Sequence, residues 1–333
     1  MFKAHKNMAF AKFIIMAIAA PVLIVNCAKD RDGRARKTIG VNQYMEHPLL
    51  EEARKGMIDE LNKQGITEDN GYFLIYRNAG GDQLTAAQIN TQFVNQKVSM
   101  IVALGTPSAQ SAIKATKTIP IVFGVITDPV ASGLAITEQA PGGNKTGTSD
   151  RWPYDKQIRL IRMICPMARR VGIVLNPGES NTEASMKHIR PLLKSYQLDI
   201  VEVPVVNSSE VMQAARSLVG RCDVYLIPGD NTVISAISSI VKVANENKIP
   251  LFAGDEDSVK NGAIATYGNN YYEVGIATGR IIAKIFKESI SDIGSIPVAV
   301  ATDANLIINL KAAKEQGAQV PEDLIKLAKR IIQ

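Results

Sequence analysis

The chain has 333 residues, of which 46% are hydrophobic and 21% charged, and its formal net charge is +6. This length and apolar content suffice for two compact lobes and exclude a disordered chain or a repeat array. Residues 1–37 carry eight Lys/Arg and two Asp/Glu, which leaves 30 basic and 30 acidic residues for the remainder. The folded body is therefore neutral, and we expect no nucleic-acid binding through a broad basic face.

The N-terminus has the pattern of an export signal. A basic segment precedes the apolar run 13–25, which contains Pro21 and is too short for a membrane span. The run ends just before Cys27, which predicts a signal peptide over residues 1–27 and Cys27 as the lipidated first residue of the mature chain. Asn26 is unusual in that context, so an ordinary signal peptide is the alternative. Either way we expect an exported protein at the periplasm or the outer face of the cell membrane, with residues 28–37 as a tether.

From residue 38 onward, predicted strands and helices alternate. Short, nearly all-apolar runs are typical of parallel strands that are covered on both faces. In the first set we expect strands at 38–44, 72–79, 100–105 and 119–126, and helices at 47–65, 82–97 and 106–116. A crossover rich in Gly, Ser and Pro follows at 131–150 and separates this set from a second one.

The second set repeats the alternation. We expect helices at 153–165, 181–197, 208–220 and 231–248, and strands at 170–176, 199–205, 223–229 and 250–255. The tail adds a strand at 263–268, a helix at 271–286 and further elements at 296–301 and 305–317. Two such sets predict an α/β protein with two doubly wound parallel-sheet lobes and a multi-segment hinge. Lobe 1 is expected at 38–149 plus about 265–296, and lobe 2 at 150–264 plus about 297–333.

Two cysteines remain besides Cys27. Cys165 and Cys222 each lie shortly before a predicted strand of the second set, and these two strands are expected to be neighbours. A disulfide between them is possible in an oxidising compartment. The alternative is two separate buried thiols.

Polar residues recur where the predicted strands end. Ligands of open parallel sheets bind beyond the carboxyl ends of the strands, so two such edges facing each other predict a cleft. Helix capping is the alternative role for several of them, and Asp128 before Pro129 also suits a turn. The candidate ligand-binding residues are Gln43, Tyr44, Thr106, Ser108, Thr127, Asp128, Asp150, Asn176, Asp230, Asn231, Asp255 and Glu256.

Catalytic patterns are missing from the sequence. It has no Gly-x-Ser-x-Gly motif, no phosphate-binding glycine loop, no zinc-ligand spacing and only three histidines. A glycosidase-type carboxylate pair would need an aromatic-lined groove, and Trp152 is the single tryptophan. We therefore expect no enzyme, no cofactor and no metal. Binding of an amino acid asks for less: a buried carboxylate for the ammonium group, and hydroxyl or backbone N–H donors, such as those around Thr106–Ser108, for the carboxylate.

Several segments resemble a known family. They include "IGVNQYMEHPLLEEARKG", "ALGTPSAQSAIKATKTIPIVFGVITDPVASGL", "PGGNKTGTSD", "PGDNTVISAI", "FAGDEDSVKNGAIATYGNNYYEVG" and "INLKAAKEQG". In this order they resemble the ABC-transporter substrate-binding proteins of the tryptophan/tyrosine-binding family, over nearly all of residues 38–320. The resemblance implies a type I periplasmic-binding-protein fold. It also implies that the chain delivers a small ligand, an aromatic amino acid in this family, to an ABC permease with its ATPase.

The same resemblance implies that the twelve residues above form a pocket between the lobes of a monomeric, membrane-anchored receptor. Two departures from the family pattern leave the ligand open: Asn42 stands where Thr is usual, and Arg151 and Trp152 are bulkier than usual. Trp152 either faces the cleft or covers the crossover. A sensory receptor subunit that uses the same cleft to signal to a membrane partner is the alternative function.

Overall fold

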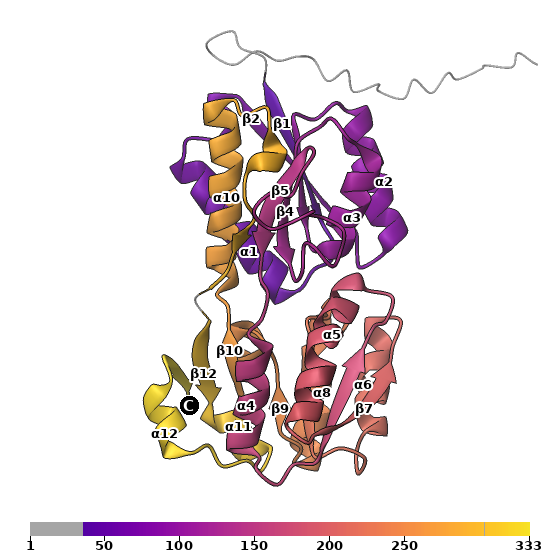
Figure 1. Cartoon of the computed structure of the whole chain (residues 1–333), viewed down its shortest axis with the longest axis vertical. Coiled ribbons are helices and arrows are strands. Elements are labelled where there is room, and N and C mark those ends of the chain that lie inside the picture. Colours follow the sequence, from indigo (N-terminus) through magenta and orange to yellow (C-terminus); the bar gives the residue numbers. More distant parts are fainter. Residues whose placement is uncertain (1–35, 303) are drawn as a thin grey trace, which may run out of the picture.

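The computed structural model describes residues 36–302 and 304–333. The predicted signal peptide, Cys27 and all but the last two residues of the tether lie outside this range. The described chain forms two lobes, one above the other in Figure 1, and each lobe is built on its own sheet. Both expectations of the fold, two α/β lobes and several connections between them, are confirmed.

The sheet of lobe 1 has six parallel strands in the order β11-β5-β4-β3-β1-β2. The central strands are buried along their whole length because helices cover both faces. The strands are β1 (Lys37–Gln43), β2 (Tyr72–Asn78), β3 (Met100–Leu104), β4 (Ile121–Ile126), β5 (Lys145–Ser149) and β11 (Ala299–Val300). The helices are α1 (Pro48–Lys63), α2 (Gln83–Asn95), α3 (Thr106–Ala115) and α10 (Tyr271–Glu288).

Helices α1 and α10 lie side by side although they are far apart in the sequence (Figure 1). Glycines permit the close approach: a Cβ on Gly56 would lie 2.0 Å from the carbonyl oxygen of Tyr272, and one on Gly275 would lie 1.9 Å from that of Ala53. The second visit of the chain to lobe 1 is thus fixed by backbone-to-backbone packing of two helices.

The sheet of lobe 2 has seven strands in the order β13-β12-β10-β9-β8-β6-β7. All neighbours are parallel except β10 and β12, which are antiparallel. The strands are β6 (Arg170–Leu175), β7 (Asp199–Pro204), β8 (Val224–Leu226), β9 (Leu251–Phe252), β10 (Ala265–Gly268), β12 (Asn305–Asn309) and β13 (Arg330–Ile332). The helices are α4 (Tyr154–Ile164), α5 (Ser180–Ser195), α6 (Val211–Ser217), α7 (Asn231–Ser235), α8 (Ile237–Asn247), α9 (Glu256–Lys260), α11 (Leu310–Glu315) and α12 (Glu322–Leu327). The helix expected at 231–248 is therefore two helices, which meet at Ala236.

Three segments cross between the lobes: the one from β5 to α4, the one from β10 to α10, and the one from β11 to β12 (Figure 1). The last two crossings differ from the boundaries expected at about 265 and 296. Strand β10 pairs with β9 and β12 of lobe 2, and β11 pairs with β5 of lobe 1. Short strands of two to four residues carry little signal of which sheet they join, so the crossings lie a few residues later than expected.

Of the two alternatives for Cys165 and Cys222, the structure has separate thiols, because both cysteines are free. Their strands β6 and β8 are indeed neighbours. However, Cys165 ends helix α4, whereas the sulfur of Cys222 packs over Gly172 beside Leu218. Burial raises the pKa of Cys222 to about 11 and that of Cys165 to about 12, so both thiols stay protonated and unreactive near neutral pH.

Candidate functional site

A narrow cavity lies between the lobes and takes residues from both of them. About 20 Å³ of it is open to a water-sized sphere, little more than the roughly 10–15 Å³ that one water molecule needs. Its lining residues are His47, Leu49, Thr106, Val125, Thr127 and Tyr271 from lobe 1, Asp150 and Trp152 from the crossing segment between β5 and α4, and Asn181, Gly229, Asn231 and Ile234 from lobe 2. We call this the ligand cavity.

The carboxylate of Asp150 in the ligand cavity has one oxygen without a hydrogen-bond partner among the described residues. Asp150 is 5% exposed, and its Oδ2 accepts a hydrogen bond of 2.6 Å from the hydroxyl of Tyr271. Its Oδ1 is buried and has no hydrogen-bond partner within the described part of the chain. Burial raises the pKa of Asp150 to about 6, so the carboxylate is the main form at pH 7. A buried carboxylate oxygen of this kind is suited to accept from a cationic group.

Trp152 and Tyr271 form an aromatic wall beside that carboxylate. The indole Nε1 of Trp152 donates to the hydroxyl of Tyr271 over 2.8 Å, and that hydroxyl donates to Asp150. The indole lies directly on the backbone of Gly254, where a Cβ would come within 1.8 Å of Trp152 Cε3. Gly254 therefore leaves the space that the indole fills, and Trp152 faces the cavity.

His47 connects the lobes across the ligand cavity. Its Nε2 lies 3.1 Å from Oδ1 of Asn231, which belongs to lobe 2. Burial lowers the pKa of His47 to about 4, so the imidazole is neutral near pH 7. Its Nδ1 and the Oδ1 of Asn181 are buried and lack partners among the residues described. The cavity therefore holds polar atoms on both of its lobe faces that are available to a ligand.

The lobe 1 wall of the cavity includes the first residue of α3 and an irregular part of β4. Thr106 opens α3, and the first backbone N–H groups of a helix have no partner inside it. The pairing of β4 with β5 shifts register between Phe123 and Ile126, and Val125 in this shift has a φ of 59°. A positive φ is strained for a β-branched residue, and such strain concentrates at functional sites.

Four of the twelve predicted residues line the ligand cavity: Thr106, Thr127, Asp150 and Asn231. In lobe 1, three others are used by the protein itself. The side-chain amide of Gln43 donates to Glu51 Oε1 and to the Met45 carbonyl oxygen, the hydroxyl of Tyr44 donates to the carbonyl oxygen of Gly81, and Ser108 donates to Asn42. None of these three side chains lines the cavity.

Asp230 and Asn176 belong to a buried network in lobe 2. Asp230 Oδ1 accepts from the N–H of Val233, as the N-cap of α7, and Oδ2 accepts from the N–H of Asn176 and the hydroxyl of Thr182. Glu179, which is not among the twelve predicted residues, binds the same helix: its carboxylate accepts from the N–H groups of Asn231 and Thr232 and from their side chains. Burial and the charge of Glu179 raise the pKa of Asp230.

Asp255 and Glu256 also lie away from the ligand cavity. Both oxygens of Asp255 accept from Ser258, one from its N–H and one from its hydroxyl, so Asp255 caps α9. Glu256 pairs with Lys260 and Arg330 at the surface of lobe 2. The acidic run 255–257 is thus the start of a helix.

Asp128 lies at the rim of the cleft. Its Oδ1 accepts from the N–H groups of Val130 and Ala131, which makes it the turn residue that the sequence suggested. The same carboxylate lies 3.5 Å from Arg151 and 3.7 Å from Nε2 of His188 on α5 of lobe 2. Asp128 therefore joins the two lobes without lining the cavity.

His47, Asn181 and Tyr271 line the ligand cavity as well, although they are not among the twelve predicted residues. His47 is 4% exposed and stands at the N-cap position of α1. Its position directly after the first strand was the available signal, as was the bulk of Trp152 directly after the crossover. Among the described residues, no group of three or more His, Cys, Asp or Glu is placed to hold a metal ion. None of the helices in this range is long and apolar enough to cross a membrane.

Residues 38–332 match the protein family described as ABC transporter substrate binding protein. The tyrosine-binding protein of Clostridioides difficile is 37% identical over 302 residues, which are 90% of this chain and 87% of that protein. The solved structure of an ABC domain from Streptococcus pneumonia in complex with L-Trp is 29% identical, covers 89% of this chain and 100% of that one, and has a TM-score of 0.85. The ligand-free, open structure of a substrate-binding protein with adhesive properties from Clostridium difficile is 35% identical over 89% and 99% of the two chains, with a TM-score of 0.66.

The present structure agrees better with the L-Trp complex than with the ligand-free, open structure, although its sequence is closer to the latter. Both comparisons cover the same share of this chain, which indicates that the lobes are arranged more as in the complex. The match over residues 38–332 and the 37% identity to a tyrosine-binding protein together show that the chain belongs to the family of ABC transporter substrate-binding proteins.

Proposed function

We propose that this protein binds an α-amino acid with an aromatic side chain in the ligand cavity and delivers it to the permease of an ABC importer. The observation that carries the proposal is the carboxylate of Asp150, which is buried, has an unpartnered oxygen, and adjoins the rings of Trp152 and Tyr271. The ammonium group of an aromatic amino acid could pair with this oxygen while the ligand's ring packs against Trp152 and Tyr271. The family is extracytoplasmic and not enzymatic, which agrees with a role in capture and delivery.

The polar groups of the cavity fall into acceptors, which suit the ligand ammonium, and donors, which suit the ligand carboxylate. Asp150 Oδ1 and Asn181 Oδ1 are acceptors, which suit the ligand ammonium. The first turn of α3 at Thr106 offers N–H donors and the positive end of the helix dipole, which suit the ligand carboxylate. Leu49, Val125 and Ile234 add apolar surface for the side chain. Two similar proteins support the same ligand class, since one is a tyrosine-binding protein and the other was solved in complex with L-Trp.

Calorimetry with L-Tyr, L-Trp and L-Phe tests the proposal, with L-Leu and the deaminated analogue of each aromatic ligand as comparison compounds. A ligand at 100 times its Kd should also add about 2.7 kcal/mol to the free energy of unfolding. Asp150→Asn should weaken binding roughly 10- to 100-fold, as expected for loss of a hydrogen bond to a charged group.

The matched control is Asp155→Asn, an exposed carboxylate on the same chain segment. It should bind like the wild type. If Asp150→Asn also binds like the wild type, or if no aromatic amino acid binds at all, the proposed function is refuted.

We also propose that the mature chain begins at Cys27 and is held at the membrane by a lipid on that residue. The basic segment and the apolar run that ends just before Cys27 support this. Labelled fatty acid should enter the wild-type protein and not the Cys27→Ser variant; equal labelling of the two would point to another anchor.

A further inference from the structure

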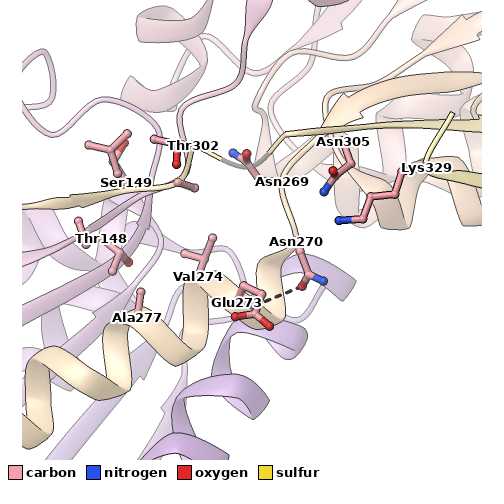
Figure 2. A pocket seen from close by; sticks show the side chains of 13 residues that line it. Thr148, Ser149, Asn269, Asn270, Glu273, Val274, Ala277, Thr302, Asn305 and Lys329 are labelled. Carbon is pink, nitrogen blue, oxygen red and sulfur yellow. Dashed lines mark hydrogen bonds between the residues drawn. The ribbon is translucent and has the colours of Figure 1, made fainter. Parts of the chain in front are cut away.

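A second and larger hollow lies at the hinge, with a volume of about 460 Å³. Figure 2 shows it from close by. We call it the hinge pocket. Its lining residues are Thr148, Ser149, Asn269, Asn270, Glu273, Val274, Ala277, Ala299, Val300, Ala301, Thr302, Asn305 and Lys329. They come from all three crossing segments and from both lobes.

The crossing segments separate the hinge pocket from the ligand cavity. Neighbouring residues on these segments line different hollows: Ser149 lines the hinge pocket and Asp150 the ligand cavity, and likewise Asn270 and Tyr271. At both places the lining changes from one hollow to the other between consecutive residues, because this part of the chain forms the wall between them. The two hollows therefore lie on opposite sides of the same hinge.

The two walls of the hinge pocket belong to different lobes. Glu273, Val274 and Ala277 lie on α10 of lobe 1, and Asn305 and Lys329 lie opposite them at the edge of lobe 2 (Figure 2). A rotation about the crossing segments that separates the lobes at the ligand cavity must bring them together on the other side. Opening the cleft thus narrows the hinge pocket.

We propose that this narrowing controls the balance between open and closed lobes: the hinge pocket must collapse when the cleft opens, so any group that keeps it wide favours the closed form. Ligand that binds the closed form then binds more tightly, because the apparent Kd equals the intrinsic Kd divided by the closed fraction. This consequence for affinity rests on the function proposed above, whereas the lobe balance itself does not.

Two substitutions keep the pocket wide by different means. Ala277→Leu puts bulk into it from α10, at a half-buried position where a helix tolerates leucine well. Glu273→Lys puts a positive charge opposite Lys329, so the collapsed pocket would bring two like charges together. Lys284→Leu and Glu288→Lys are the matched controls, since both positions are exposed on the same helix and neither lines the pocket.

Small-angle X-ray scattering of the ligand-free proteins measures the lobe balance directly. Both test variants should have a smaller radius of gyration than the wild type, and calorimetry with the bound amino acid should show an affinity about three- to tenfold higher. The controls should match the wild type in both measurements. Unchanged scattering in both test variants, or a shift toward the open form, overturns the proposal. If the wild type binds no aromatic amino acid, the proposed function fails while the scattering still decides the hinge question.

Discussion

At the scale of single residues, the burial of Asp150 makes ligand binding depend on pH. Its pKa is raised to about 6, whereas a ligand ammonium favours the carboxylate form. A protonated Asp150 must lose its proton before the ligand binds, so the affinity for the ligand falls as the pH drops below 6. His47 does not obscure this effect, because its pKa of about 4 keeps it neutral over the same range.

We therefore expect the affinity for the amino acid to be about tenfold lower at pH 5 than at pH 7.5, since roughly ten protonated Asp150 side chains then stand against each ionised one. Calorimetry in buffers of different ionisation enthalpy should also show proton release on binding near pH 6. The Asp150→Asn variant should bind weakly at all of these pH values. A flat profile in the wild type would mean that Asp150 does not face the ligand charge.

The backbone strain at Val125 lowers the stability of the folded protein but shapes one wall of the ligand cavity. Its φ of 59° costs on the order of 1–3 kcal/mol for a β-branched residue. Val125→Gly removes this strain, so the free energy of unfolding should stay within about 1 kcal/mol of the wild type while ligand affinity falls. Val122→Gly is the control: that residue is fully buried on the same strand without a positive φ, and its loss should cost about 3 kcal/mol. If urea unfolding shows equal losses of unfolding free energy for Val125→Gly and Val122→Gly, the backbone at Val125 is not strained.

At the scale of elements, the short helix α7 depends on carboxylates from outside it. Its five residues begin at Asn231, and Asp230 and Glu179 together accept from its first three N–H groups. Glu179 also accepts from the side chains of Asn181 and Asn231, which line the ligand cavity. Glu179 is therefore a positioning residue for one wall of the site.

Glu179→Gln replaces one accepting oxygen by a donor and leaves an N–H unpaired. We expect a loss of about 2 kcal/mol in urea unfolding and a ligand affinity lowered about tenfold, because Asn181 and Asn231 lose their orientation. Glu183→Gln on the next turn should change stability by less than about 1 kcal/mol, since its partner Arg190 is a surface contact. A variant that loses stability but keeps full affinity would show that Glu179 only caps the helix.

At the scale of the whole molecule, polar contacts at the start of α5 hold the lobes together. The side chain of Gln83 donates to the carbonyl oxygen of Gly178 over 3.0 Å, and the hydroxyl of Ser180 donates to Gln110 over 3.0 Å. Both contacts join lobe 1 to lobe 2 beside the ligand cavity.

The double variant Gln83→Ala with Gln110→Ala should favour open lobes. We expect a ligand affinity lowered about three- to tenfold, corresponding to about 1 kcal/mol for exposed hydrogen bonds, with the unfolding of the ligand-free protein nearly unchanged. Scattering should show a larger radius of gyration with subsaturating ligand. Identical affinity in variant and wild type would indicate that these contacts do not contribute to closure.

The two lobes could be predicted because buried parallel strands are continuous apolar runs and the helices between them carry clear caps, such as Asp82 at α2. The positions of the crossings were less predictable, because tertiary packing and not local sequence decides which sheet the short strands β10 and β11 join. At the site, strand-end position selected the correct edge but not the direction of each side chain. An acid at a strand end suits the cap of the next helix as well as a ligand, and Asp230 and Asp255 do the former. Tyr271 lines the cavity as the first residue of α10, shortly after β10 ends, but the search for polar side chains at strand ends did not select an aromatic residue there.

The small volume of the ligand cavity has a kinetic consequence. With about 20 Å³ free between the closed lobes, an amino acid can enter the cavity only while the lobes are open, so every binding event begins with an opened molecule. The observed association rate should then rise with ligand concentration only up to a plateau, and that plateau equals the rate of lobe opening. Slow lobe opening therefore lowers the rate of ligand capture. It also lowers the rate of ligand dissociation, so the bound ligand is retained until the protein reaches the permease.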